Sequence, residues 1–272
     1  MKKILVPTDF SEASRKASEY AARLAKTFDA TLQLLYVFLE PAAIGEVPSI
    51  WLMTEMQLQE ENDVLIKKEV AYLNKQFGVR VQGKAVNGFK SEEISANALE
   101  IKADLIVMGM KGSGGSKLMG STTLSTMRKT KIPLIVVPED AVFSPLKNIT
   151  FATDYSEKTN LSCFGVLFDI ACMFDSNIRM VNVRENAERM RTTEIAGKVR
   201  LENVLSSLKH DYYTVQDRNV ESGIKSFLEK YPTDLLAMVA HHHNVFEYLF
   251  GTIHTRSMCQ HINLPVLILE DK

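Results

Sequence analysis

The chain has 272 residues, enough for one large domain or two domains of ordinary size. Apolar residues make up 46% and charged residues 24%, which is typical of a soluble globular protein, and the formal net charge of -1 argues against a general nucleic-acid-binding protein. Three cysteines without a CxxC spacing, and apolar runs too short for a signal peptide or a membrane span, favour a cytoplasmic protein with no membrane association.

The first half alternates short β-type runs with segments of helical periodicity. We expect five strands, over Lys3–Pro7, Thr31–Phe38, Val79–Val86, Leu105–Gly109 and Leu134–Val137. We expect helices from Ser11 to Phe28, over Glu55–Phe77 and Ser91–Lys102, and within Ser121–Thr130, with a loop over Pro41–Pro48. Ser11 and Ser91 are the expected N-caps of the first and third helices. This alternation predicts an α/β fold with a parallel sheet covered by helices on both faces.

The second half repeats the first in the same order. Lys2–Glu12 reads KKILVPTDFSE, and Lys147–Glu157 reads KNITFATDYSE, so that Asp9 matches Asp154. Later matches pair ADLIVM at 103–108 with TDLLAM at 233–238, and the terminal runs IPLIVVP and LPVLIL close the two copies. A period of this length indicates tandem domains and not a solenoid. We place the domains at residues 1–140 and 146–272.

Two motifs leave predicted strands at the edge where an open parallel sheet holds its ligands. Pro7-Thr8-Asp9 leaves the first strand, and a glycine-rich segment from Gly109 to Thr122 leaves the fourth. Glycines running into a helix N-terminus present unhindered amides to an anion, and Lys111 adds positive charge. Taken singly, the glycines also fit a flexible loop, and Asp9 fits an ordinary turn before a helix.

These residues resemble the universal stress protein family over essentially the whole chain, twice. The landmarks are ILVPTDFS, ADLIVMG, the glycine segment closing in Gly-Ser, and IPLIVVP. The resemblance implies two Rossmann-like or flavodoxin-like domains, each with a five-stranded parallel sheet. It also implies binding of ATP or AMP, with Mg²⁺ as a possible companion. The implied nucleotide-binding residues are Pro7, Thr8, Asp9, Val37, Met108, Gly109, Lys111, Gly112, Gly120, Ser121 and Thr122.

The glycine segment departs from the family pattern in both halves. Seven residues separate Gly112 from Gly120, two fewer than the family places there. In the second half both early glycines are replaced, although Asp154 remains. We therefore interpret the second domain as a structural partner that has lost ordinary nucleotide binding. Pairing of the last strands, Leu134–Val137 with Val266–Leu269, would make the chain an intramolecular pseudo-dimer, and the family resemblance adds a possible homodimer.

The second half also carries a histidine cluster. His241, His243 and His254 are candidate metal ligands, although adjacent histidines on an extended segment point in different directions, which argues against zinc. The favoured hypothesis is a stress-response or regulatory module that binds an adenine nucleotide in its first domain and is not a conventional enzyme. The alternatives are a slow ATP hydrolase, a ligand-free protein-interaction scaffold and a metal-responsive module.

Overall fold

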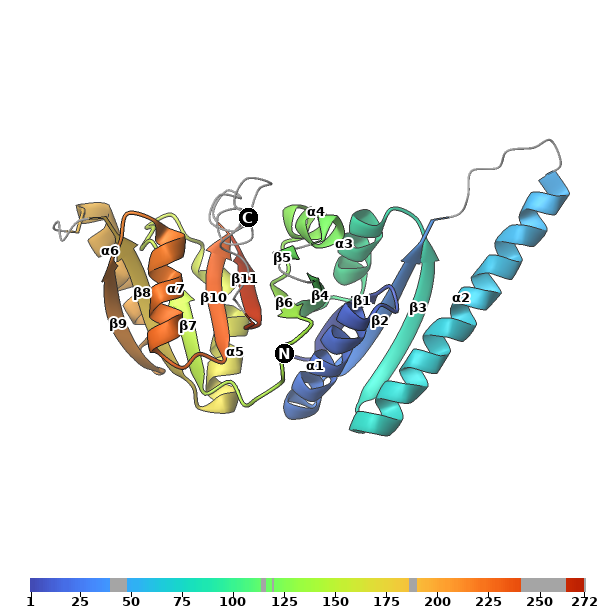
Figure 1. The fold of residues 1–272 in the computed structure, drawn as a ribbon, viewed down its shortest axis with the longest axis horizontal. Helices are drawn as coiled ribbons and strands as arrows, with labels where there is room; N and C mark the ends of the chain where they lie inside the picture. Colours follow the sequence, from blue (N-terminus) through green and yellow to red (C-terminus); the bar gives the residue numbers. More distant parts are fainter. Residues whose placement is uncertain (40–47, 114–115, 119, 186–189, 241–262, 272) are drawn as a thin grey trace.

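The computed structural model describes residues 1–39, 48–113, 116–118, 120–185, 190–240 and 263–271. The strands of the first half are β1 (Lys3–Thr8), β2 (Thr31–Phe38), β3 (Arg80–Asn87), β4 (Leu105–Ser113), β5 (Ser116–Leu118) and β6 (Leu134–Pro138). Those of the second half are β7 (Asn148–Ala152), β8 (Asn177–Arg184), β9 (Lys209–Gln216), β10 (Leu235–Ala240) and β11 (Val266–Glu270). Together they form one continuous sheet (Figure 1).

The strand order is β3-β2-β1-β4-β6-β11-β10-β7-β8-β9, with β5 attached to β4. Within each half the five main strands are parallel, and the halves join where β6 and β11 pair antiparallel through Leu134–Val136 and Val266–Ile268. The predicted fold class, two tandem α/β halves with five-stranded parallel sheets, is confirmed.

Helices cover both faces of this sheet (Figure 1). They are α1 (Glu12–Phe28), α2 (Pro48–Phe77), α3 (Lys90–Glu100), α4 (Ser121–Lys129), α5 (Gly165–Phe174), α6 (Thr192–Leu205) and α7 (Val220–Lys230). Apolar side chains of α1, α2, α5 and α6 pack into one core, and those of α3, α4 and α7 pack into a second core on the opposite face. Each core contains residues of both halves, so that the halves share their interior.

Aromatic side chains fill the junction between the halves on the α1 side. Phe143, from the segment that connects the halves, lies between Tyr20 of α1 and Phe174 of α5, with ring centroids 5.0 and 6.5 Å away. Phe28 of α1 also contacts Phe174, at 6.3 Å. Because edge-to-face aromatic contacts add to ordinary apolar burial, this cluster reinforces the β6–β11 junction.

Most predicted boundaries agree with the structure, with three differences. Ser11 is the N-cap of α1 and accepts a hydrogen bond from the Ser14 amide, as predicted. The predicted cap at Ser91 is wrong: Gly88, with φ of 152°, turns the chain out of β3 so early that Phe89 is the N-cap of α3. The second difference is the start of α2, which was predicted at Glu55 and lies at Pro48. Proline is well tolerated at the first position of a helix. Residues 41–47 of the predicted loop Pro41–Pro48 lie outside the described residues, and Pro48 belongs to α2.

The third difference is the predicted glycine loop. Strand β4 does not end at Gly109 but continues to Ser113 and pairs antiparallel with β5, Gly112 opposite Lys117. The sequence between the paired segments, Gly114-Gly115, is typical of a two-residue hairpin turn. The open loop expected after Gly109 is therefore corrected over its described residues: Lys111–Ser113 pair with Ser116–Leu118, and α4 begins at Ser121.

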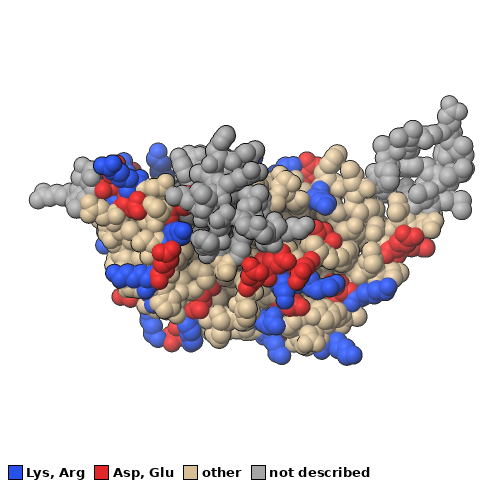
Figure 2. Space-filling view, viewed as in Figure 1, with Lys and Arg blue, Asp and Glu red and all other residues tan. Residues whose placement is uncertain are grey.

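Two surface properties bear on possible partners. In the described part of the chain, no helix is long and apolar enough to cross a lipid bilayer. On the face seen in Figure 2, the described acidic and basic side chains are intermingled. This face therefore lacks, over its described residues, the extended basic surface typical of nucleic-acid binding.

We expect Gly109→Ala to destabilise the protein, because α1 passes directly over this position. A Cβ at residue 109 would lie 2.4 Å from the backbone oxygen of Ala13 and 2.6 Å from its carbonyl carbon. Overpacking against backbone typically costs about 1–3 kcal/mol. Urea unfolding measures the loss, and Gly165→Ala is the control because a Cβ there meets nothing within 4 Å. Equal stabilities of the two variants would contradict the close approach.

Candidate functional site

The carboxyl ends of β1, β2 and β4 surround a cavity in the first half. Strand β1 lies between β2 and β4, so the chain direction around the sheet reverses at this point, where open α/β sheets hold their ligands. The cavity has a volume of about 200 Å³. Its lining residues are Pro7, Thr8, Asp9, Ser11, Ala13, Ser14, Leu35, Val37, Lys90, Ile94, Met108, Gly109, Gly120, Thr122 and Thr123.

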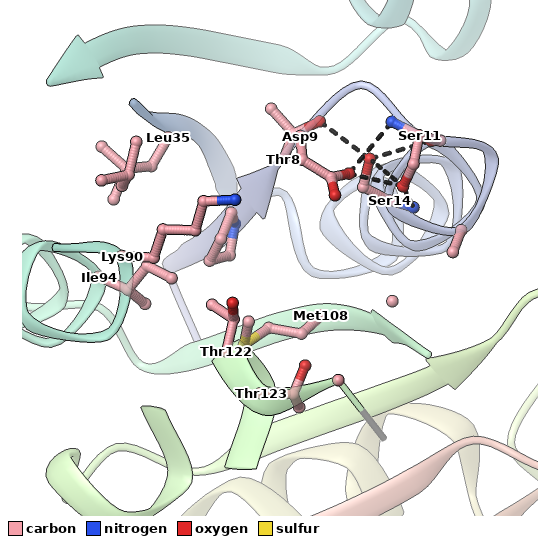
Figure 3. A pocket seen from close by; sticks show the side chains of 15 residues that line it. Thr8, Asp9, Ser11, Ser14, Leu35, Lys90, Ile94, Met108, Thr122 and Thr123 are labelled. Carbon is pink, nitrogen blue, oxygen red and sulfur yellow. Dashed lines mark hydrogen bonds between the residues drawn. The ribbon is translucent and has the colours of Figure 1, made fainter. Parts of the chain in front are cut away.

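The turn between β1 and α1 fixes the carboxylate of Asp9 (Figure 3). Phe10 has φ of 61°, and its amide donates to the hydroxyl of Thr8 at 3.1 Å. One carboxylate oxygen of Asp9, Oδ1, accepts from the amide of Ser11 at 3.1 Å and from its hydroxyl at 2.5 Å. Asp9 therefore enters the cavity wall as a preoriented hydrogen-bond acceptor.

The surroundings keep Asp9 ionised. Partial burial raises the pKa of Asp9, but hydrogen bonds from Ser11 and Ser14 and the positive charge of Lys90 together lower the pKa below its usual value of 3.8. At neutral pH the group is a carboxylate that can accept hydrogen bonds from a bound hydroxyl or amino group.

Apolar side chains form the opposite walls. Leu35 and Val37 come from β2, Ile94 from α3 and Met108 from β4, and all four are buried. Gly109 continues the wall without a side chain because the first turn of α1 lies against it. A flat ring could be held between these walls while Asp9 bonds to its polar edge.

Positive charge and the start of a helix also contribute to the cavity lining. Gly120 is the N-cap of α4 and provides no side-chain cap hydrogen bond, and Thr122 and Thr123 of the first turn line the cavity. The first amides of a helix attract an anion, and the helix dipole adds to this attraction. Lys90 reaches into the same cavity from the start of α3 (Figure 3).

The structure brings most of the predicted site residues together. Eight of them line the cavity: Pro7, Thr8, Asp9, Val37, Met108, Gly109, Gly120 and Thr122. Ser121 is the exposed first residue of α4 and is outside the lining. Lys111 and Gly112 lie in the extension of β4, which pairs with β5.

Sequence reasoning missed Lys90, Leu35, Ile94 and Ser14. The signal for Lys90 was present in the sequence, because α3 follows β3 and therefore starts at the same edge of the sheet as the turn after β1 and the start of α4, which also line the cavity. The candidate metal ligands His241, His243 and His254 lie outside the described residues. Within the described ranges, no group of three His, Cys, Asp or Glu side chains is arranged to hold a metal ion.

Comparisons with known proteins find several similar universal stress proteins, one of them with the same fold over nearly the whole chain. Universal stress protein MJ0531 of Methanocaldococcus jannaschii is 34% identical over 139 residues, covering 50% of this chain and 81% of the relative. A universal stress protein structure from Archaeoglobus fulgidus covers 99% of this chain and 98% of its own, with a TM-score of 0.73 at 18% identity. A universal stress protein solved in complex with cAMP covers 50% of this chain at 22% identity, with a TM-score of 0.37.

The family model provides the assignment. The model of the universal stress protein family matches residues 1–138, half of the chain, and this match contains β1, β4 and the cavity between them. The chain therefore belongs to the universal stress protein family.

Proposed function

We propose that the cavity of the first half binds an adenine nucleotide, AMP or ATP, and that the protein is a nucleotide-dependent regulatory module. The observation that carries this proposal is the combination of groups that line the cavity. The fixed carboxylate of Asp9, apolar side chains, Lys90 and the first turn of α4 all line the same space. The flat, hydrogen-bonding body of adenosine suits the carboxylate and the apolar walls, and the negative charge of its phosphate suits Lys90 and the first amides of α4.

The size of the cavity favours a ligand with a short phosphate chain. Its volume of about 200 Å³ is below the roughly 300–1,000 Å³ of pockets that enclose a drug-sized ligand. A base and sugar fill most of this space, and the first phosphate reaches Lys90 and α4. Further phosphates of ATP, with Mg²⁺, would extend beyond the cavity toward the β4–β5 hairpin.

Binding is favoured over catalysis by the environment of Asp9. Among the described lining residues Asp9 is the one carboxylate, and Ser11 already donates two hydrogen bonds to it. A lowered pKa makes it a weak general base, because such a group works best with a pKa near the working pH. We therefore assign Asp9 to ligand recognition.

The proposal assigns the nucleotide to a first domain, residues 1–140, and makes residues 146–272 its partner domain. A cytoplasmic location, a homodimer and the use of Mg²⁺ remain predictions from the sequence. A metal-responsive role for the histidine cluster, His241, His243 and His254, also remains a prediction from the sequence.

Asp9→Ala tests recognition of the nucleoside. We expect affinity for AMP, measured by isothermal titration calorimetry, to fall about tenfold or more, because a hydrogen bond to a charged group contributes roughly 1.5–3 kcal/mol. Asp154→Ala is the matched control, since Asp154 also accepts the amide two residues on, from Ser156 at 3.0 Å. Equal affinities of the two variants for AMP would reject the assignment, as would absence of AMP and ATP binding by the unmodified protein.

Lys90→Ala tests recognition of the phosphate. We expect AMP affinity to fall about 2–5-fold, the range for an exposed charge pair, while adenosine affinity stays unchanged. The second ionisation of a phosphate monoester lies near pH 6, so AMP should bind more tightly as pH rises from about 5 to 7. The increase in AMP affinity over this pH range should be smaller in the Lys90→Ala variant. Lys16→Ala, on the exposed side of α1, is the control, and a rise of equal size in both variants would contradict the role of Lys90.

A further inference from the structure

Phe10, in the turn that follows β1, has a backbone conformation that is rare for an aromatic residue. Its φ of 61° lies in the left-handed region, where a Cβ crowds the neighbouring carbonyl oxygen. For a residue other than glycine this region is disfavoured by a factor of roughly 5–30 relative to the right-handed one. Such a conformation persists only where the surrounding structure holds it. The contacts of Phe10 therefore identify what holds the turn.

A hydrogen bond and a ring contact hold Phe10 in place. Its amide donates to the hydroxyl of Thr8 at 3.1 Å. Its ring lies against that of Tyr36 on β2, with ring centroids 4.7 Å apart, and Tyr36 in turn stacks on Phe38 at 6.1 Å. Phe10 and Tyr36 are partly buried and pack against the core on the α1 side of the sheet. Aromatic pairs at such separations stabilise beyond ordinary burial, so the ring contact offsets the unfavourable backbone.

The conformation of residue 10 decides where the hydrogen-bond donors of Asp9 lie. One carboxylate oxygen of Asp9 accepts from the Ser11 amide at 3.1 Å and from the Ser11 hydroxyl at 2.5 Å (Figure 3). The backbone rotations of residue 10 lie between Asp9 and the peptide plane that carries the Ser11 N–H. A change to the right-handed region would turn that N–H and the start of α1 away from the carboxylate. The aim of Asp9 therefore depends on a residue that stays left-handed.

The residue after Asp154, in the second half, is again aromatic and left-handed. Tyr155 has φ of 54°, its amide donates to the Thr153 hydroxyl at 3.0 Å, and Asp154 accepts from the Ser156 amide at 3.0 Å. The ring that contacts Tyr155 is Tyr212 of β9, at 6.5 Å. The same turn thus occurs twice, each time beside a different aromatic ring. This repetition indicates that the left-handed residue belongs to the turn itself.

A glycine at position 10 would adopt the left-handed region without cost but would leave the turn free to take other conformations. We propose that Phe10 and Tyr36 are positioning residues of the nucleotide site: the contact of their rings holds residue 10 left-handed and thereby aims the Asp9 carboxylate into the cavity. Neither ring is among the described residues that line the cavity, so both act through Asp9. The inference rests on the proposed function for the ligand that Asp9 recognises, but the aim of Asp9 is measurable without that ligand.

Phe10→Ala and Phe10→Gly separate positioning from packing. Both variants remove the ring, but alanine resists the left-handed region and glycine does not. We expect Phe10→Ala to weaken AMP binding about fivefold or more, and Phe10→Gly to weaken it less than about threefold, by isothermal titration calorimetry. A side chain that only filled space would give equal losses, or a larger loss with the smaller glycine.

The pKa of Asp9 gives a readout that needs no nucleotide. Burial raises this pKa, and hydrogen bonds from Ser11 and Ser14 and the charge of Lys90 bring it below its usual value. Loss of the Ser11 donors should therefore raise the pKa. Titration of the ¹³C carboxyl signal, assigned with Asp9→Asn, should give a higher pKa in Phe10→Ala than in Phe10→Gly.

Tyr36→Leu tests the ring contact while residue 10 is unchanged. We expect this variant to weaken AMP binding about 2–10-fold, the range for loss of an aromatic pair. In a chain that already has Phe10→Gly, Tyr36→Leu should have no further effect on AMP affinity or on the pKa of Asp9, because the contact is already absent. Equal effects of Tyr36→Leu in the two chains would contradict its action through Phe10.

Tyr155→Ala and Tyr155→Gly are the matched controls, because they change the equivalent turn of the second half. Both should leave AMP affinity and the pKa of Asp9 unchanged, and urea unfolding shows whether binding merely follows stability. Equal pKa values of Asp9 in Phe10→Ala and Phe10→Gly would overturn the inference. If these pKa values differ while AMP affinity does not change, the aim of Asp9 stands and its role in the proposed function fails.

Discussion

The first cavity depends on the close approach of α1 to β4. The backbone of Ala13 lies where a side chain at position 109 would begin, so the helix can start immediately after β1 only because that residue is glycine. This early start places Ser11 and Ser14 beside Asp9, and their hydrogen bonds hold the carboxylate in the wall and lower its pKa. Without that approach, Ser14 would lie farther from Asp9, and the carboxylate would lose one of the donors that preorganise it.

The second half lacks this constraint and is built differently at the same place. Val239 occupies the position of Gly109, and the first helix of this half, α5, begins only at Gly165, well after β7 ends at Ala152. A turn and a short 3₁₀ helix, Leu161–Phe164, lie before α5. The loss of glycine and the later helix start are consistent with one another, because the side chain of valine needs the space that α1 occupies in the first half. The duplicated sheet persists because its core residues are retained in both halves.

The sequence allowed the architecture to be predicted better than the site. Alternation of strands and helices, and the repeat of Asp9 at Asp154, depend on local patterns and were sufficient for the fold class and for the approximate bounds of β1, β2, β3 and β6. The β4–β5 hairpin was missed because glycines leave a segment free to be a loop or a turn, and pairing with a neighbouring segment decides between them. Lys90 was missed because its role arises from tertiary proximity, α3 and α4 both starting beside one cavity, and not from a motif.

The pairing of β4 with β6 and then with β5 indicates where a ligand could alter the surface. Strand β4 is paired with β6 as far as Met110, opposite Pro138, and in the described part of the chain its extension beyond Met110 pairs with β5. The paired region lies within two cores that extend across both halves, and closely packed interiors resist gradual deformation. A ligand shifts a conformational equilibrium only where its contacts differ between the states. Because β4 leaves the shared sheet just beyond the cavity residue Gly109, and Gly120 and Thr122 at the start of α4 line the cavity, the response to the proposed nucleotide should be confined to this edge, with the sheet that joins the halves as its rigid support.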